Sequence, residues 1–236
     1  MPPLGRAMKR MLPLAMLALA GPALAGEPLA TDDASILERG VCQFEAWHRW
    51  SPNGGHEGWG VPACSVADWL ELGAGFARSR DRDAGGHTLV LLQAKTVFAG
   101  DADGRWSAGA VASALRDGAR ESRHTGFAQS ALLGLASFNL LDDRLRIHAN
   151  AGIVHDRDDG TTGAWGTALE YDFFHAWTAL AEVFRDGPGR PSYQVGVRYT
   201  LVTDRVELFA SGGERFGGGS DWFAKFGVRF QSWPLF

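Results

Sequence analysis

After its first 25 residues the chain has no long run of apolar side chains. The longest such runs span only a few residues, as in residues 88–92. A membrane-spanning helix needs about 20 consecutive apolar residues, so this part of the chain offers no candidate for one. Lipid offers backbone groups no hydrogen bonds, so a chain without such a helix crosses a membrane only as a closed barrel.

The chain also lacks a basic stripe, a basic tail and a Pro/Ser-rich linker. Lys95 and Lys225 are the only lysines beyond residue 25. Nucleic acid is therefore excluded as a partner, because its phosphates call for clustered basic residues. Without a linker, the remaining residues are expected to form one domain.

The first 25 residues have the three parts of a secretory signal peptide. Arg6, Lys9 and Arg10 precede a short apolar stretch over 11–20, and residues 23–25 form an Ala-Leu-Ala cleavage site. The apolar stretch is too short to span a bilayer. We expect a signal peptide over residues 1–25 and a barrel domain over 26–236, whose net charge is −7 with histidine neutral.

In the remainder, apolar and polar residues alternate in segments of about a dozen residues, near the length that a tilted strand needs to cross a bilayer. Tight turns alternate with longer polar loops, as in outer-membrane barrels. The sequence therefore predicts an all-β protein, a closed antiparallel transmembrane β-barrel of about 12 strands. The predicted strands cover residues 40–50, 57–66, 69–80, 87–99, 105–116, 125–140, 145–155, 162–173, 177–185, 192–202, 206–215 and 222–233.

Successive strand residues point to opposite faces, so each strand separates a lipid face from a lumen face. In 145–155, for example, Leu145 and Ile147 share one face while Arg146 and His148 share the other. The expected lumen-lining residues are Gln43, Glu45, Arg49, Glu71, Gln93, Lys95, Arg146, His148, Glu170, Asp172, Glu182, Gln194, Arg198, Glu207, Lys225 and Arg229.

Three of the predicted strands, 57–66, 105–116 and 125–140, alternate poorly, and Pro62 removes one ladder hydrogen bond from the first of them.

All nine tryptophans fall near predicted strand ends, where an indole suits the lipid headgroup level. Tryptophans of a soluble β-sandwich or lipocalin-like barrel, the competing fold, would lie in mid-strand. The tryptophans are Trp47, Trp50, Trp59, Trp69, Trp106, Trp165, Trp177, Trp222 and Trp233.

The two cysteines are expected to form a disulfide. In a hairpin centred on Asn53, Cys42 lies opposite Cys64 and Trp47 lies opposite Trp59. Opposed residues of antiparallel strands come within disulfide range, and the exported compartment is oxidising. The chain has no C-x-x-C motif and no histidine cluster, so we expect no metal and no cofactor.

The stretch PLATDDASILERGVCQFEAW, residues 28–47, resembles the opening of the outer-membrane family named for the MetA pathway of phenol degradation. The matching residues are Thr31, Asp32, Asp33, Ala34, Gly40, Gln43 and Glu45. The resemblance implies an outer-membrane barrel that conducts small compounds, aromatic or hydrophobic ones included. It implies no enzyme, and it assigns no residue a role.

The segment 225–230 has the polar-x-Gly-x-x-aromatic spacing of a final barrel strand, and the chain ends in Phe236. This spacing resembles the signal by which outer-membrane barrels are recognised for assembly, although the tail 231–236 departs from it. The expected partners are therefore outer-membrane lipid, the barrel-assembly machinery and a small solute that the sequence does not identify. The expected location is the outer membrane of a Gram-negative bacterium.

The function expected from the sequence is a passive channel or transport-related pore for small molecules. Barrels of about eight strands are filled by side chains and barrels of about 16–18 strands are open channels, and twelve strands lie between the two. The strand number therefore does not decide between a pore and a plugged barrel with a structural or adhesion role. An outer-membrane lipid-modifying enzyme is a third class, with His56, His124 and His155 as loop candidates. Neighbouring strand residues point to opposite faces and make poor catalytic sets, so no catalytic residue is assigned.

Overall fold

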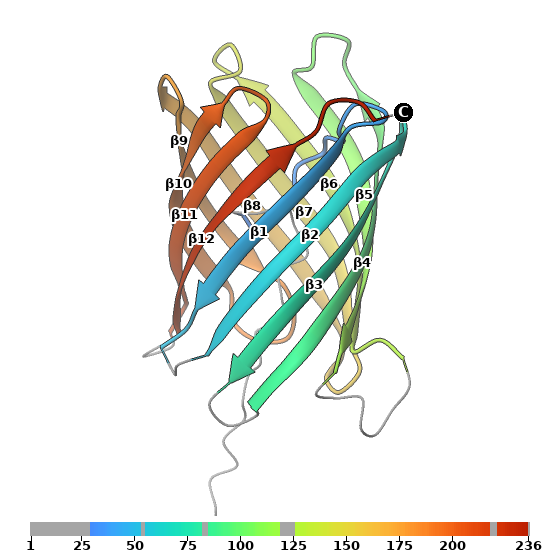
Figure 1. The fold of residues 1–236 in the computed structure, drawn as a ribbon, viewed down its shortest axis with the longest axis vertical. Helices are drawn as coiled ribbons and strands as arrows, with labels where there is room; N and C mark the ends of the chain where they lie inside the picture. Colours follow the sequence, from blue (N-terminus) through green and yellow to red (C-terminus); the bar gives the residue numbers. More distant parts are fainter. Residues whose placement is uncertain (1–28, 53–54, 82–84, 119–125, 218–220, 236) are drawn as a thin grey trace, which may run out of the picture.

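The computed structural model describes residues 29–52, 55–81, 85–118, 126–217 and 221–235. Twelve antiparallel strands pair in chain order, and β1 pairs with β12 to close the barrel (Figure 1). The prediction of a closed twelve-stranded antiparallel barrel is confirmed. The strands are β1 (Cys42–Trp50), β2 (His56–Ala67), β3 (Leu70–Asp81), β4 (Gly85–Gly100), β5 (Trp106–Asp117), β6 (Gln129–Leu140), β7 (Leu145–Asp156), β8 (Gly160–Phe174), β9 (Trp177–Arg185), β10 (Ser192–Val202), β11 (Val206–Arg215) and β12 (Trp222–Gln231).

The two ends of the barrel differ. The short connections β2–β3, β4–β5, β6–β7, β8–β9 and β10–β11 share the end at which the chain terminates, and we call it the turn end (Figure 1). The loop end carries the other connections. Outer-membrane barrels place short turns on the periplasmic side and longer loops outside. Within the described residues, no helix is long and apolar enough to cross a membrane.

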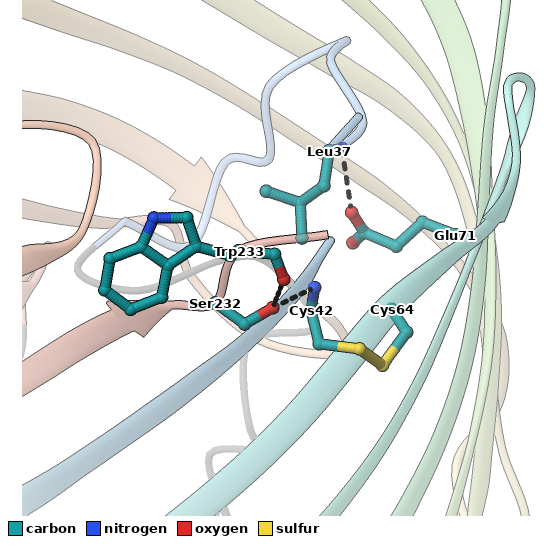
Figure 2. Close-up of a disulfide and its surroundings, with 6 residues drawn as sticks. All are labelled: Leu37, Cys42, Cys64, Glu71, Ser232 and Trp233. Atoms are coloured by element: carbon teal, nitrogen blue, oxygen red, sulfur yellow. Dashed lines mark hydrogen bonds between the residues drawn. A yellow bond between two sulfur atoms is a disulfide. The ribbon is translucent and has the colours of Figure 1, made fainter. Parts of the chain in front are cut away.

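The first hairpin has the predicted register. Cys42 lies opposite Cys64 and Trp47 opposite Trp59, and the two sulfur atoms are bonded with a Cα–Cα distance of 4.0 Å. The disulfide is therefore present, at the turn end of β1 and β2 (Figure 2). Pro62 pairs with β1, whereas the ladder from β2 to β3 lacks pairs between Gly60 and Ala63.

The outer face of the barrel is apolar. Leu132, Val195 and Phe226 are each more than half exposed, and each alternates along its strand with a residue that faces the lumen. An apolar surface of this kind suits acyl chains rather than water.

The lumen has an apolar wall on one side. Six large aliphatic side chains of β4, β5 and β6 are buried there and belong to one contact cluster that continues onto β2, β3, β7 and β8. We define the apolar wall as Leu89, Leu91, Val111, Leu115, Leu133 and Leu135. The predicted strands 105–116 and 125–140 alternate poorly for this reason, because β5 and β6 are apolar on both faces.

Two of the nine tryptophans do not lie at the headgroup level. Trp47 and Trp59 face the lumen, where their rings stack with centroids 5.7 Å apart. The expectation for these two was wrong, because their positions along β1 and β2 place them on the same face as Glu45 and Val61. The other seven are each at least 39% exposed, as expected for indoles outside the lumen.

Candidate functional site

Residues 29–41, which we call the inner segment, lie inside the barrel (Figure 1). Leu29, Thr31, Asp32 and Ala34 are each less than 5% exposed. At Gly166 of β8 the contact is so close that an added Cβ would meet the Thr31 hydroxyl at 2.2 Å. The inner segment therefore occupies part of the lumen that the strands enclose.

Glu182 of β9 holds the first residues of the inner segment. Its Oε1 accepts a hydrogen bond from Ala30 N at 2.6 Å, and its Oε2 accepts one from Thr31 N at 2.8 Å. The side-chain amide of Gln194 on β10 also donates to Glu182. The inner segment belongs to no strand, so its backbone N–H groups have no ladder partners. The Glu182 carboxylate accepts hydrogen bonds from two of them instead.

The middle of the inner segment is bound by β6 and β7. Ala34 N donates to Ser137 Oγ at 2.7 Å, and Ser137 Oγ lies 2.8 Å from His148 Nδ1. The Asn150 amide, oriented to satisfy both of its atoms, bonds the backbone N–H and C=O of Asp32 at 2.6 and 2.9 Å.

Lys95 of β4 forms the main ionic contact with the inner segment. Its Nζ lies 2.8 Å from Asp32 Oδ1 and 2.5 Å from Asp33 Oδ1. Glu71 of β3 lies directly across from Lys95 in the ladder, and its Oε2 accepts a hydrogen bond from Leu37 N at 3.2 Å (Figure 2). The ammonium is thus directed at the segment rather than at its cross-strand carboxylate.

The inner segment leaves the lumen at the turn end. Gly40 has φ +80°, a conformation that favours glycine, and its carbonyl accepts from Leu235 N at 2.8 Å. Ser232 N donates to Cys42 O at 2.8 Å, and Ser232 Oγ accepts from Cys42 N at 3.0 Å (Figure 2). The C-terminal tail therefore fixes the exit of the inner segment beside the disulfide.

The lumen side opposite the apolar wall carries alternating charges. Arg229 of β12 lies 2.7 Å from Glu45 on β1 and 3.2 Å from Glu207 on β11. The three residues are direct cross-strand partners, so the ladder register itself brings the charges together.

The alternation continues onto β10, β8 and β7. Arg198 lies 2.5 Å from Glu170, and Arg146 lies 3.1 Å from the same carboxylate and 2.9 Å from Asp172. Asp172 also accepts from the Thr178 hydroxyl at 2.6 Å. Buried charges need partners of this kind, because an unpaired desolvated charge costs several kcal/mol. We define the charged wall as Glu45, Arg229, Glu207, Arg198, Glu170 and Arg146.

A cavity of about 250 Å³ lies between the inner segment and the charged wall, and Leu91 of the apolar wall also lines it. Trp47, Trp59, Val61 and Leu91 supply its apolar lining. A cavity with both apolar surface and convergent polar groups can hold a small molecule.

Eleven of the sixteen residues expected in the lumen line this cavity. They are Gln43, Glu45, Glu71, Gln93, Lys95, Arg146, His148, Glu170, Arg198, Glu207 and Arg229. Among the other five, Asp172, Glu182 and Gln194 make the contacts given above. Arg49 lies across from Lys225 in the β1–β12 ladder, with its guanidinium 4.6 Å from the centroid of Phe223.

The position of the inner segment and of the two stacked tryptophans was not predicted from the sequence. The inner segment has no strand periodicity, and nothing in its local pattern separates a lumen-bound stretch from an exposed linker. The tryptophans could have been placed from the register that predicted the disulfide, because Trp47 lies on the same face as Glu45 in β1.

The loop histidines are not gathered into a catalytic set in the described part of the chain. His155 Nδ1 lies 3.0 Å from the Thr161 hydroxyl, and His56 stacks on His48. His124 lies outside the described residues. No group of three or more His, Cys, Asp or Glu side chains suited to a metal occurs among the described residues.

The fold is shared with known outer-membrane barrels. A KdgM porin is 12% identical, with 81% of this chain and 99% of that chain covered and a TM-score of 0.64. The same porin in complex with disordered oligogalacturonate has a TM-score of 0.62, at the same identity and coverage. The COG4313 outer membrane channel from Pseudomonas putida F1 is 13% identical, with 85% of this chain and 98% of that chain covered and a TM-score of 0.56.

At these identities the likeness concerns the fold. None of the curated proteins matches the chain in sequence. The model of one protein family matches residues 14–228, so the chain belongs to the family described as Uncharacterised conserved protein UCP029691.

Proposed function

We propose that this protein is an outer-membrane channel for small molecules. The observation that carries the proposal is the cavity of about 250 Å³ inside a closed barrel whose lumen is lined by charged and polar side chains. A barrel with only a structural role has no need of a cavity between its walls. The fold shared with a porin and an outer membrane channel supports the same conclusion.

We further propose that hydrophobic or aromatic molecules are among the solutes. The stacked pair Trp47 and Trp59 and the neighbouring Leu91 give the cavity an apolar surface. The resemblance of residues 28–47 to the MetA-pathway family supports this solute class. Outer-membrane lipid and the barrel-assembly machinery are the partners of this proposal, and it includes no catalytic step.

The inner segment sets the width of the path. Lys95 binds two of its carboxylates, so neutralising this ammonium leaves Asp32 and Asp33 without their cation. Because Asp32 is only 4% exposed, its unpaired charge favours release of the segment into water. Lys95→Gln should therefore widen the path.

The test is the swelling rate of liposomes that contain the folded barrel, measured with solutes of increasing size. The wild-type protein should admit small solutes, and Lys95→Gln should admit larger ones. Arg105→Gln, which removes an exposed cation of the β4–β5 turn, is the control and should leave the size limit unchanged. Liposomes that do not swell with either the wild-type protein or Lys95→Gln would contradict the proposal.

A plugged barrel is the second candidate, because the inner segment is bonded to β3, β4, β6, β7 and β9. The same assay separates the two functions. Swelling with Lys95→Gln but not with the wild-type protein would favour the plugged barrel.

A further inference from the structure

We infer that the lumen cavity binds a small organic cation, an ammonium group carried on an aromatic or apolar body. This inference deepens the proposed function, since it names the class of solute that the channel would favour. Binding itself can be measured whether or not the barrel conducts.

The charges that line the cavity are unequal. The carboxylates are Asp32, Asp33, Glu45, Glu71, Glu170 and Glu207, against the cations Lys95, Arg146, Arg198 and Arg229. Acidic groups therefore exceed basic ones by two, and the excess favours a cationic guest.

The surplus of carboxylates lies around the Lys95 ammonium. One ammonium serves Asp32 and Asp33, and Glu71 lies across from the same lysine. Glu71 accepts a hydrogen bond from Leu37 N. Lys95 thus pairs with two carboxylates among the described residues, and a third lies beside it in the ladder.

An unused acceptor marks the same place. Asp32 is among the residues that line the cavity, and its Oδ2 is itself buried and has no hydrogen-bond partner among the described residues. A buried polar atom without a partner is costly, and an ammonium would supply the N–H donors that it lacks if the Asp32 side chain turned its Oδ2 toward the cavity. The missing partner of this oxygen points to a cation independently of the number of charged side chains.

The apolar part of the cavity lining suits the body of the guest. The rings of Trp47 and Trp59 are stacked with an interplanar angle of 12°, and Val61 packs beside them. An indole face is the best aromatic partner for a cation and also accepts an apolar ring.

An anion of the same size would compete with carboxylates that the arginines already hold, although Arg198 Nε has no hydrogen-bond partner among the described residues. Each of the three arginines that line the cavity already has a carboxylate partner, Arg229 with Glu45, Arg198 with Glu170 and Arg146 with Asp172. An anionic guest would have to displace one of these pairs, and it would leave the displaced carboxylate buried without its cation.

The test is isothermal titration of the full-length mature barrel, folded in micelles, with benzylammonium. Benzoate and benzyl alcohol, an anion and a neutral molecule of similar shape, are titrated as controls, and empty micelles correct for partitioning. Benzylammonium should bind more tightly than either control by about tenfold or more.

Two variants locate the site. Glu71→Gln keeps an acceptor for Leu37 N but removes one charge, and Asp33→Asn removes another. Each should weaken benzylammonium binding by about five- to tenfold and leave benzyl alcohol unchanged. Glu214→Gln is the control, because Glu214 lies at the loop end of β11 and accepts from the Tyr193 hydroxyl.

Folding of every variant is checked by its heat-dependent shift on a gel. Equal binding of benzylammonium and benzoate would overturn the inference, as would unchanged affinity in both Glu71→Gln and Asp33→Asn. Tight cation binding by a barrel that does not conduct would refute the proposed channel but not this site. A barrel that conducts but binds benzylammonium no more tightly than benzoate would support the proposed channel and refute the cation site.

Discussion

The two walls of the lumen are built on different principles. The charged wall, on β1, β7, β8 and β10–β12, brings together arginines and carboxylates that are cross-strand partners or lie within 3.2 Å. The apolar wall, on β4–β6, is an ordinary hydrophobic core in which side chains such as Val111 and Leu91 are at most 5% exposed. All six residues of the charged wall line the cavity, whereas the apolar wall contributes Leu91 to its lining.

The difference shows that a barrel of this size need not be polar throughout its interior. A charge in a narrow lumen must be paired, so the charged wall depends on every partner being present. An aliphatic wall has no such requirement, and its contribution depends on how completely it fills space. The two walls should therefore respond differently to truncation.

The largest effect is expected in the charged wall. Arg229→Met removes the cation that Glu45 and Glu207 share and leaves Glu207 with Arg198 at 3.7 Å, which should lower the free energy of unfolding by about 3 kcal/mol. Urea unfolding in lipid vesicles, followed by tryptophan fluorescence, measures this. Arg105→Met is the control, because its ion pairs with Asp101 and Asp103 are exposed and should contribute at most about 1 kcal/mol. Equal losses in both variants would mean that the buried pairs are no stronger than the exposed ones.

The next effect concerns the apolar wall. Leu133→Ala should leave a void in the wall and cost about 3 kcal/mol in unfolding free energy. Leu132→Ala removes a neighbour that is 55% exposed on the outer face, so its cost should be smaller. The same vesicle assay compares them. A larger loss for Leu132→Ala would reverse our assignment of the two faces of β6.

The disulfide lies where β1 of the charged wall meets β2, which carries part of the apolar cluster. Replacing Cys42 and Cys64 together by alanine should lower the unfolding free energy by about 2–3 kcal/mol, because the cross-link restricts the unfolded chain. A thiol assay on the unfolded, unreduced protein is the direct check. It should find no free thiol, and two thiols per chain would show that the bridge is absent.

The smallest change in stability is expected at the β4–β5 turn, where the charged side chains are exposed rather than buried as in the charged wall. Hydrogen bonds, first of all from Trp106 N, lower the pKa of Asp101. A lowered pKa stabilises the fold above the ordinary pKa of the group, and this stabilisation is lost as the pH falls through the lowered value. Asp101→Asn should therefore be slightly less stable than wild type near neutral pH, and the difference should vanish in strong acid. A difference that grows with acidification would contradict this sign.

Much of the barrel could be predicted because lipid and lumen impose opposite demands on alternate residues. β7, β10 and β12 show this separation clearly, and a hairpin centred on Asn53 has the register that pairs Cys42 with Cys64. The apolar wall could not be predicted in the same way. On β5 and β6 both faces are apolar, so Leu132 and Leu133 are not distinguished by polarity.

The position of the inner segment inside the barrel could not be predicted from the sequence either. Its contacts join Asp32 and Asp33 to Lys95, and Ala30 to Glu182, across long stretches of sequence. No local pattern encodes such pairs, and only the closed barrel brings them together. The candidate lumen residues could be named from alternation, but the cavity they surround depends on the inner segment.

The most direct test of the proposed channel is single-channel recording in planar lipid bilayers with the folded barrel. We expect discrete conductance steps from the wild-type barrel, and larger steps from Lys95→Gln. Barrels shown to be folded and inserted that pass no current in either form would contradict the account.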